Sequence, residues 1–120
     1  MDGNGRWAKR RHLPRVAGHA KGALQAKQVI TACATRDIPY VTLFAFSTEN
    51  WARPAEEVSA LMGLFLKYLK GELSGMVEQG VRLKVLGDLT PFSPELRDAI
   101  NHAEAITAGG TRIQVNVAAN

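Results

Sequence analysis

The chain alternates three times between a helical pattern and a short run of strand-forming residues. The strand-like runs span residues 41–46, 81–86 and 112–117, and each follows a stretch in which apolar residues recur at helical spacing. Because two parallel strands need a long crossover connection, helices between successive strands are typical of a parallel sheet. We therefore predict an α/β fold in which a parallel sheet has flanking helices and the loops after its strands meet at one edge. The helices are expected over residues 19–36, 58–80 and 94–107.

The first strand-like run is followed directly by a polar and aromatic segment. The run over residues 41–46 shows no regular alternation of apolar and polar side chains, which is typical of a parallel strand covered on both faces. Open α/β sheets bind their ligands beyond the carboxyl ends of the strands. Helix capping next to Pro54 explains part of this segment, but it does not explain Trp51 together with Arg53. The candidate ligand-binding residues here are Ser47, Thr48, Glu49, Asn50, Trp51 and Arg53.

The first seven residues combine a carboxylate, an amide, a guanidinium group and an indole with two glycines. Gly3 and Gly5 permit backbone conformations that bring N–H groups close to an anion. Asp2 offers an oxygen ligand for Mg²⁺, and Arg6 offers a planar set of donors for a phosphate group. The stretch therefore indicates a loop that binds metal and phosphate. The alternative is an ordinary Asn-Gly turn beside a solvated arginine.

Length and charge restrict the class of protein. The 120 residues, of which 46% are hydrophobic, are enough for one domain with its own core, spanning residues 1–120. Fifteen Lys and Arg against eleven Asp and Glu give a net charge of +4, which favours anionic ligands. Cys33 is the single cysteine, so no internal disulfide can form. Because no apolar run approaches the length of a membrane span, we expect a soluble, cytoplasmic protein.

Three motifs resemble those of the cis-prenyltransferase family, in particular its bacterial undecaprenyl diphosphate synthases. They are Met1-Asp-Gly-Asn-Gly-Arg-Trp-Ala8, Arg15-x-x-Gly-His19 and Phe46-Ser-x-Glu-Asn-Trp-x-Arg-Pro54. The Gly87-Asp88 loop and the closing Asn116-x-Ala-Ala-Asn120 agree with the same family. The resemblance therefore covers the whole chain, and the first and third motifs are specific in both residue type and spacing.

The resemblance implies a reaction in which isopentenyl diphosphate units are added to an allylic diphosphate such as farnesyl diphosphate, with Mg²⁺ as cofactor. It implies that Asp2 is a catalytic residue that works with Mg²⁺, and that Asn50 accepts a proton or, as an uncharged amide, orients substrate. The allylic diphosphate would be held by Gly3, Asn4, Gly5, Arg6, Arg15 and His19. Further substrate contacts would come from Trp7, Ser47, Thr48, Glu49, Trp51 and Arg53.

The apolar stripe of the second predicted helix has two interpretations. By its spacing alone it is core. By resemblance, a helix of this kind lines a tunnel for the growing prenyl chain. The tunnel residues would be Val58, Met62, Phe65, Leu69 and, from the third strand, Ile113.

The chain also departs from the family pattern. Family members have a strand before the Met1 motif, and they continue past Asn120 through a segment that binds isopentenyl diphosphate. We therefore expect the allylic half of an enzyme that makes undecaprenyl diphosphate for a cell-wall lipid carrier, inactive on its own, homodimeric at full length, and with at most peripheral membrane contact. Two alternatives remain open: a basic phosphate- or nucleic-acid-binding module that uses Lys9, Arg10, Arg11 and the two tryptophans, and a non-catalytic prenyltransferase subunit.

Overall fold

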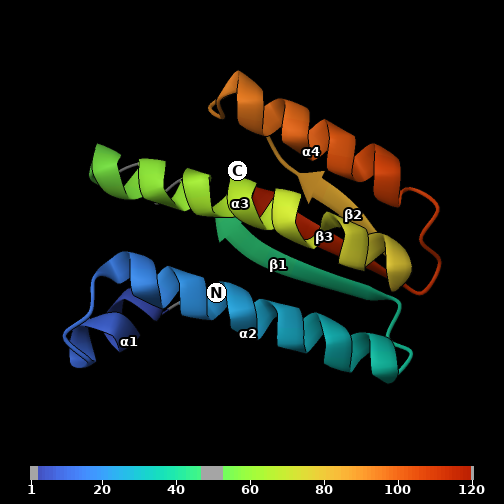
Figure 1. The fold of residues 1–120 in the computed structure, drawn as a ribbon, viewed down its shortest axis with the longest axis horizontal. Helices are drawn as coiled ribbons and strands as arrows, with labels where there is room; N and C mark the ends of the chain where they lie inside the picture. Colours follow the sequence, from blue (N-terminus) through green and yellow to red (C-terminus); the bar gives the residue numbers. More distant parts are fainter. Residues whose placement is uncertain (1–2, 47–52, 120) are drawn as a thin grey trace.

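The computed structural model describes residues 3–46 and 53–119, and Figure 1 shows their arrangement. Seven elements follow one another along the chain: α1 (Asn4–Arg10), α2 (Arg15–Thr35), β1 (Tyr40–Phe46), α3 (Ala55–Glu78), β2 (Val81–Leu86), α4 (Pro94–Thr107) and β3 (Ile113–Ala119). The three predicted strands and the alternation of helix and strand are confirmed. Two expectations at the N-terminal end are wrong. The first motif is expected to be a loop, but residues 4–10 form a helix, and α2 begins at Arg15, four residues before the expected start at residue 19.

The three strands form a parallel sheet with the order β1-β3-β2. The central strand, β3, pairs with both neighbours, so that Val115 lies opposite Val41 on one side and Leu83 on the other. All three carboxyl ends consequently point to the same edge, as the sequence predicts. The chain is thus a parallel α/β fold.

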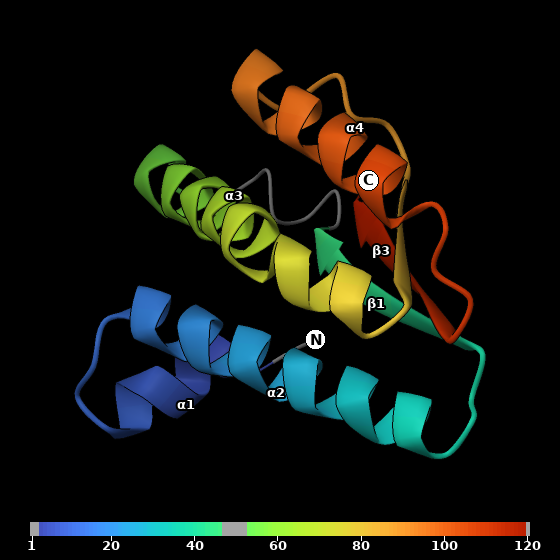
Figure 2. The same ribbon diagram turned by 45° about the vertical axis from the view of Figure 1, so that its right-hand side comes forward.

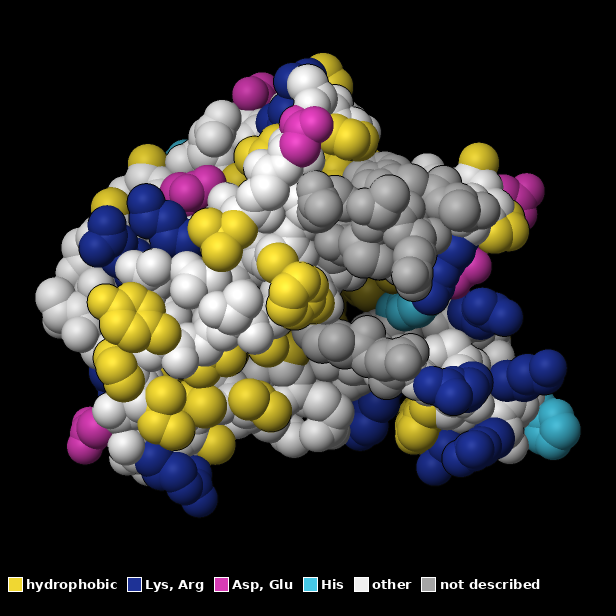
Figure 3. Space-filling model, turned by 180° about the vertical axis from the view of Figure 1, so that it is seen from behind, with side chains coloured by type: hydrophobic (Ala, Val, Ile, Leu, Met, Phe, Trp, Pro, Cys, Tyr) yellow, Lys and Arg dark blue, Asp and Glu magenta, His cyan; other side chains and the backbone are white. Residues whose placement is uncertain are grey.

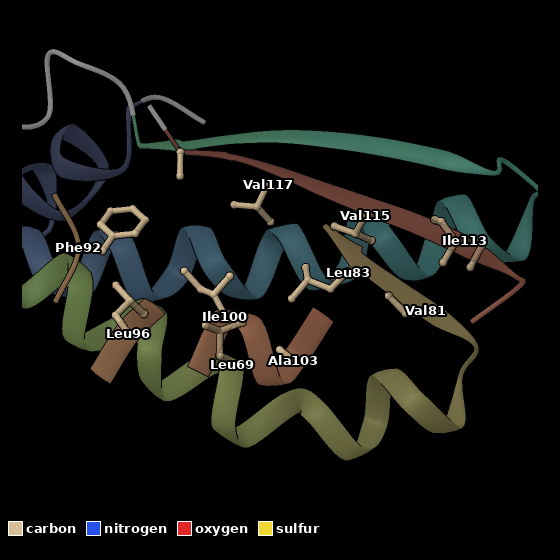
Figure 4. Packing of buried hydrophobic residues seen from close by; sticks show 12 residues of the cluster. Leu69, Val81, Leu83, Phe92, Leu96, Ile100, Ala103, Ile113, Val115 and Val117 are labelled. Atoms are coloured by element: carbon tan, nitrogen blue, oxygen red, sulfur yellow. The ribbon is translucent and has the colours of Figure 1, made fainter. Parts of the chain in front are cut away.

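The core lies between one face of the sheet and the helices α2, α3 and α4, which all cover that face (Figures 2 and 4). Along β3 every second residue is buried, beginning at Ile113, because alternate side chains of a strand point to opposite faces. Leu69 of α3 and Ile100 of α4 meet these side chains from the helical layer. Ser93 accepts a hydrogen bond from the Leu96 N–H at 3.2 Å and starts α4 at Pro94, as predicted.

The opposite face of the sheet is uncovered by any described element. Tyr40 and Phe44 of β1 are 65% and 68% exposed, and Leu86 at the end of β2 is 46% exposed. Figure 3 views the molecule from this side, where hydrophobic side chains gather on the surface. The expectation that the run over residues 41–46 is covered on both faces is therefore wrong for the described part of the chain, since its helices all lie on one face.

None of the described helices combines the length and hydropathy that a crossing of the bilayer requires.

Candidate functional site

A cavity of about 270 Å³ lies at the carboxyl end of β1, between α1, α2 and α3. It brings together residues that the sequence keeps far apart. The predicted site residues that line it are Gly3, Asn4, Gly5, Arg6, Arg15, His19 and Arg53, and the rest of the wall is Ala23, Ala45, Leu61, Leu64, Phe65 and Tyr68.

Other predicted residues lie elsewhere. Trp7 does not line the cavity, and its ring instead carries the Arg11 guanidinium group at 4.3 Å from the ring centroid. The predicted residues outside the described part of the chain are Asp2, Ser47, Thr48, Glu49, Asn50 and Trp51.

The first motif is largely helical and not a loop. Gly3 precedes α1 in the left-handed region, at φ 83°, where glycine is favoured because it has no Cβ. Its carbonyl accepts a hydrogen bond from the Trp7 N–H at 2.9 Å, which closes the first turn of α1. The motif therefore places its side chains by helix geometry, which sequence reasoning based on two glycines did not anticipate.

The close approach of α1 to α2 depends on Gly18 and Gly22, which lie one turn apart and are both buried. A Cβ on Gly18 would overlap the carbonyl oxygen of Asn4, and a Cβ on Gly22 would overlap the Asn4 side chain. No larger residue fits at position 18 without a shift of α1, and a larger residue at position 22 would require the Asn4 side chain to move. These two glycines thus hold the first motif beside the Arg15–His19 motif, at the wall of the cavity.

One carboxylate connects the basic side chains of the cavity. Glu57 Oε1 lies 3.0 Å from Arg53 Nη1, 3.4 Å from His19 Nε2 and 3.9 Å from Arg15 Nη1. The Glu57 side chain is only 13% exposed. Burial raises its pKa, but the hydrogen bond with His19 and the charges of Arg53 and Arg15 outweigh that effect, so the pKa of Glu57 lies below its ordinary value. Glu57 is therefore ionised at neutral pH.

Sequence reasoning did not single out Glu57. Its spacing of four residues from Arg53 is a weak signal for an ion pair across one helical turn. The contacts with Arg15 and His19 join two helices and could be seen only in the fold.

The basic side chains of the cavity belong to a strongly polarised part of the chain. Residues 3–36 contain no Asp or Glu and eight Lys or Arg, namely Arg6, Lys9, Arg10, Arg11, Arg15, Lys21, Lys27 and Arg36. In Figure 3, Lys and Arg side chains gather at one end of the molecule, beside a hollow that a histidine borders. The end of the molecule that carries the cavity thus suits an anionic ligand.

An apolar groove of about 260 Å³ continues from the polar cavity, between α2 and α3 and above the sheet. The two share four lining residues, Ala23, Ala45, Phe65 and Tyr68. Leu43, Val115 and Val117 form its floor from the strands, and Ala26 and Ile30 form one side. The site therefore has a basic mouth and an apolar extension.

The predicted tunnel residues separate into two groups. Phe65 and Leu69 line the apolar groove. Val58, Met62 and Ile113 do not line it: Met62 packs against the core and Ile113 is fully enclosed by the sheet and its helices. The tunnel assignment of all five stays a prediction.

The described residues contain no cluster of three or more His, Cys, Asp or Glu side chains that could hold a metal ion. Apart from Tyr68, the polar side chains that line the cavity carry nitrogen donors, and these fit an anion better than a cation. A magnesium site would depend on Asp2, which lies outside the described residues.

Comparison with known proteins gives a consistent result. Residues 1–120 match the prenyltransferase family described as undecaprenyl diphosphate synthase. The chain is 52% identical over its full length to an isoprenyl transferase of Nitrosomonas europaea, and 56% identical to the ditrans,polycis-undecaprenyl-diphosphate synthase ((2E,6E)-farnesyl-diphosphate specific) of Pseudomonas aeruginosa. These matches cover 46% and 48% of the two relatives, so the chain spans about half the length of the curated relatives it matches.

Among solved structures, the lavandulyl diphosphate synthase of Lavandula x intermedia, in complex with dimethylallyl diphosphate, is similar at a TM-score of 0.94 and 27% sequence identity. That match covers 99% of this chain and 51% of the plant protein.

Proposed function

This chain belongs to the undecaprenyl diphosphate synthase family of prenyltransferases, and on that premise we propose that its cavity and groove form the allylic-diphosphate half of a cis-prenyltransferase active site. The family match confirms the resemblance that the three sequence motifs carry. The observation that carries the proposal is the continuity of a basic mouth with an apolar groove through four shared lining residues. Such a site suits a ligand with an anionic head and a hydrocarbon tail.

The head group would be a diphosphate. Arginine offers several donors in a plane that matches phosphate oxygens, and hydrogen bonds between charged groups are stronger than neutral ones. Arg6, Arg15 and Arg53 line the mouth, with His19 beside them. Their combined charge would also stabilise the negative charge on a diphosphate as it leaves the allylic carbon.

The tail would be a prenyl chain. Burial of hydrocarbon contributes about 0.8 kcal/mol per CH₂, so each five-carbon unit adds several kcal/mol to binding in the groove. We take the allylic substrate to be farnesyl diphosphate, because that specificity is part of the name of the Pseudomonas aeruginosa relative. The groove would then hold the tail along α3, beside Phe65 and Leu69.

The proposal for the whole protein goes further. It includes successive addition of isopentenyl diphosphate to give undecaprenyl diphosphate for a cell-wall lipid carrier, in a cytoplasmic homodimer. Asp2 would hold Mg²⁺, whose chemistry when bound is to neutralise diphosphate charge. Asn50, with Trp7, Ser47, Thr48, Glu49 and Trp51, would contact the substrates, as the family resemblance implies.

A titration with matched ligands tests the proposal on this chain. Farnesyl diphosphate, inorganic diphosphate and farnesol are each titrated by calorimetry, over a salt series. If head and tail bind in adjoining parts of one site, farnesyl diphosphate binds at least about tenfold more tightly than either half alone. Equal affinity for farnesyl diphosphate and inorganic diphosphate would contradict the groove assignment.

Single-stranded oligonucleotide serves as the comparison for the basic end of the chain. Tighter binding of the oligonucleotide than of farnesyl diphosphate, with a steep salt dependence, would favour the nucleic-acid alternative instead. Lys67→Ala is the control for a general loss of positive charge. It should leave the affinity for farnesyl diphosphate unchanged, because Lys67 is exposed and lines neither the polar cavity nor the apolar groove.

A further inference from the structure

We propose that Glu57 is a positioning residue that holds Arg53, His19 and Arg15 in the arrangement a diphosphate requires. This inference rests on the proposed function and adds a residue that the sequence motifs did not indicate. Two side chains of α2, Arg15 and His19, and Arg53 from the segment before α3 converge on one atom, Glu57 Oε1. A single carboxylate oxygen thus makes hydrogen bonds with one guanidinium group and one imidazole, and the Arg15 guanidinium group lies within ion-pair distance of the same atom.

The placement of Glu57 separates it from the ligand-binding residues. Arg15, His19 and Arg53 line the polar cavity, whereas Glu57 does not. Glu57 therefore holds these side chains from outside the space that a ligand would fill. Glu57 therefore does not occupy the space in which the ligand would bind.

Such support matters because arginine side chains are long and lose rotamer freedom when they bind a ligand. Arg53 is held by Glu57 at 3.0 Å across one turn, and Arg15 lies at 3.9 Å from the same atom while remaining largely exposed. Side chains that are already held lose less freedom on ligand binding. Preorganisation of this kind is how a residue outside the cavity raises the affinity of the cavity.

Glu57 also assigns a hydrogen-bonding role to each ring nitrogen of His19. An ionised carboxylate can only accept hydrogen bonds, so the hydrogen in the 3.4 Å contact belongs to His19 Nε2. With Nε2 assigned to Glu57, Nδ1 is the ring nitrogen left for other partners. The contact between His19 and Glu57 therefore fixes both the orientation and the hydrogen-bonding role of the imidazole.

The test uses Glu57→Gln, because positioning and simple charge predict opposite results. Removal of a negative charge beside an anion site should strengthen binding if only Coulomb attraction matters. If Glu57 positions the basic side chains, binding of farnesyl diphosphate should instead weaken by about tenfold, because a neutral amide oxygen accepts much weaker hydrogen bonds from charged donors than a carboxylate does. The matched control is Glu56→Gln, which makes the same charge change on the neighbouring, exposed residue of the same helical turn and should leave affinity within about twofold.

A second readout does not depend on ligand binding. In ¹⁵N spectra of the histidine rings without ligand, Glu57→Gln should change the Nε2 and Nδ1 signals of His19 and leave those of the exposed His12 and His102 unchanged. Circular dichroism tests whether the Glu57→Gln variant is folded. If Glu57→Gln does not fold, the same measurements are made on Glu57→Asp, which keeps the negative charge.

Affinity equal to or above that of the unsubstituted chain, or unchanged His19 signals, would overturn the inference. If the unsubstituted chain does not bind farnesyl diphosphate, the proposed function is wrong, and so is the idea that Glu57 positions side chains for this ligand. The histidine spectra then still decide whether Glu57 holds His19.

Discussion

Gly18 allows α1 to lie close to α2. A larger side chain at this position would collide with the backbone of Asn4, and not with a side chain that could move. The carbonyl of Asn4 cannot rotate away, so Gly18→Ala must displace α1 and with it the mouth of the cavity. We expect a loss of about 1–3 kcal/mol in the free energy of unfolding, as for other overpacked sites, together with weaker diphosphate binding. Urea unfolding and calorimetry measure the two effects.

The matched control is Gly63→Ala in α3. Its added Cβ meets no atom within 4 Å, so the substitution should stabilise the helix by about 0.5–1 kcal/mol. A Gly18→Ala variant as stable as Gly63→Ala would show that α1 is not held by this contact.

Glu57 makes stability depend on pH in a defined direction. Its pKa is lower in the folded protein than the ordinary 4.5, because the hydrogen bond with His19 and the charges of Arg53 and Arg15 outweigh the effect of burial. A lowered pKa contributes stability that is fully present above pH 4.5 and is lost as the pH falls through the folded value. We expect thermal unfolding of the unsubstituted chain to shift downward below about pH 4.5 more steeply than that of Glu57→Gln. Parallel curves for the two would contradict this linkage.

At the scale of elements, the groove between α2 and α3 owes its volume to small residues on α2. Ala26 lines the apolar groove but not the polar cavity. Ala26→Leu should therefore fill part of the groove and weaken farnesyl diphosphate binding several-fold, while affinity for inorganic diphosphate stays unchanged. Ala105→Leu, on the exposed side of α4, is the control for the helix itself. An equal loss for both ligands would show that the substitution acts on the fold and not on the groove.

The sequence predicted elements well where local signals and tertiary structure agree. The strand over residues 81–86 and the start of α4 at Pro94 match the structure because alternation and a Ser-Pro cap act within a few residues. Helix α1 was missed because two glycines argue locally against a helix, whereas its packing on Gly18 and Gly22 depends on residues farther along the chain. Glu57 was missed for the same reason, since two of its three partners lie about 40 residues away.

At the scale of the whole molecule, the described helices all cover the same face of the sheet. Parallel sheets are normally covered on both faces. Here the polar residues Thr42, Gln114 and Asn116 share the uncovered face with aromatic and aliphatic side chains. An exposed face of this composition favours association through its apolar part.

The last prediction concerns this face. Phe44 is 68% exposed near the carboxyl end of β1 and belongs to an apolar set with Tyr40 and Leu86. We expect the 120-residue chain to bind a hydrophobic dye and to self-associate as its concentration rises, because association removes that area from water at about 25 cal/mol per Å². Phe44→Lys should reduce both effects, measured by dye fluorescence and by sedimentation velocity. Ile106→Lys is the matched control, since Ile106 is also exposed but lies on α4, away from the sheet face. If Ile106→Lys reduces association as much as Phe44→Lys does, net charge and not the uncovered face governs the behaviour of the chain, and the role assigned to that face is wrong.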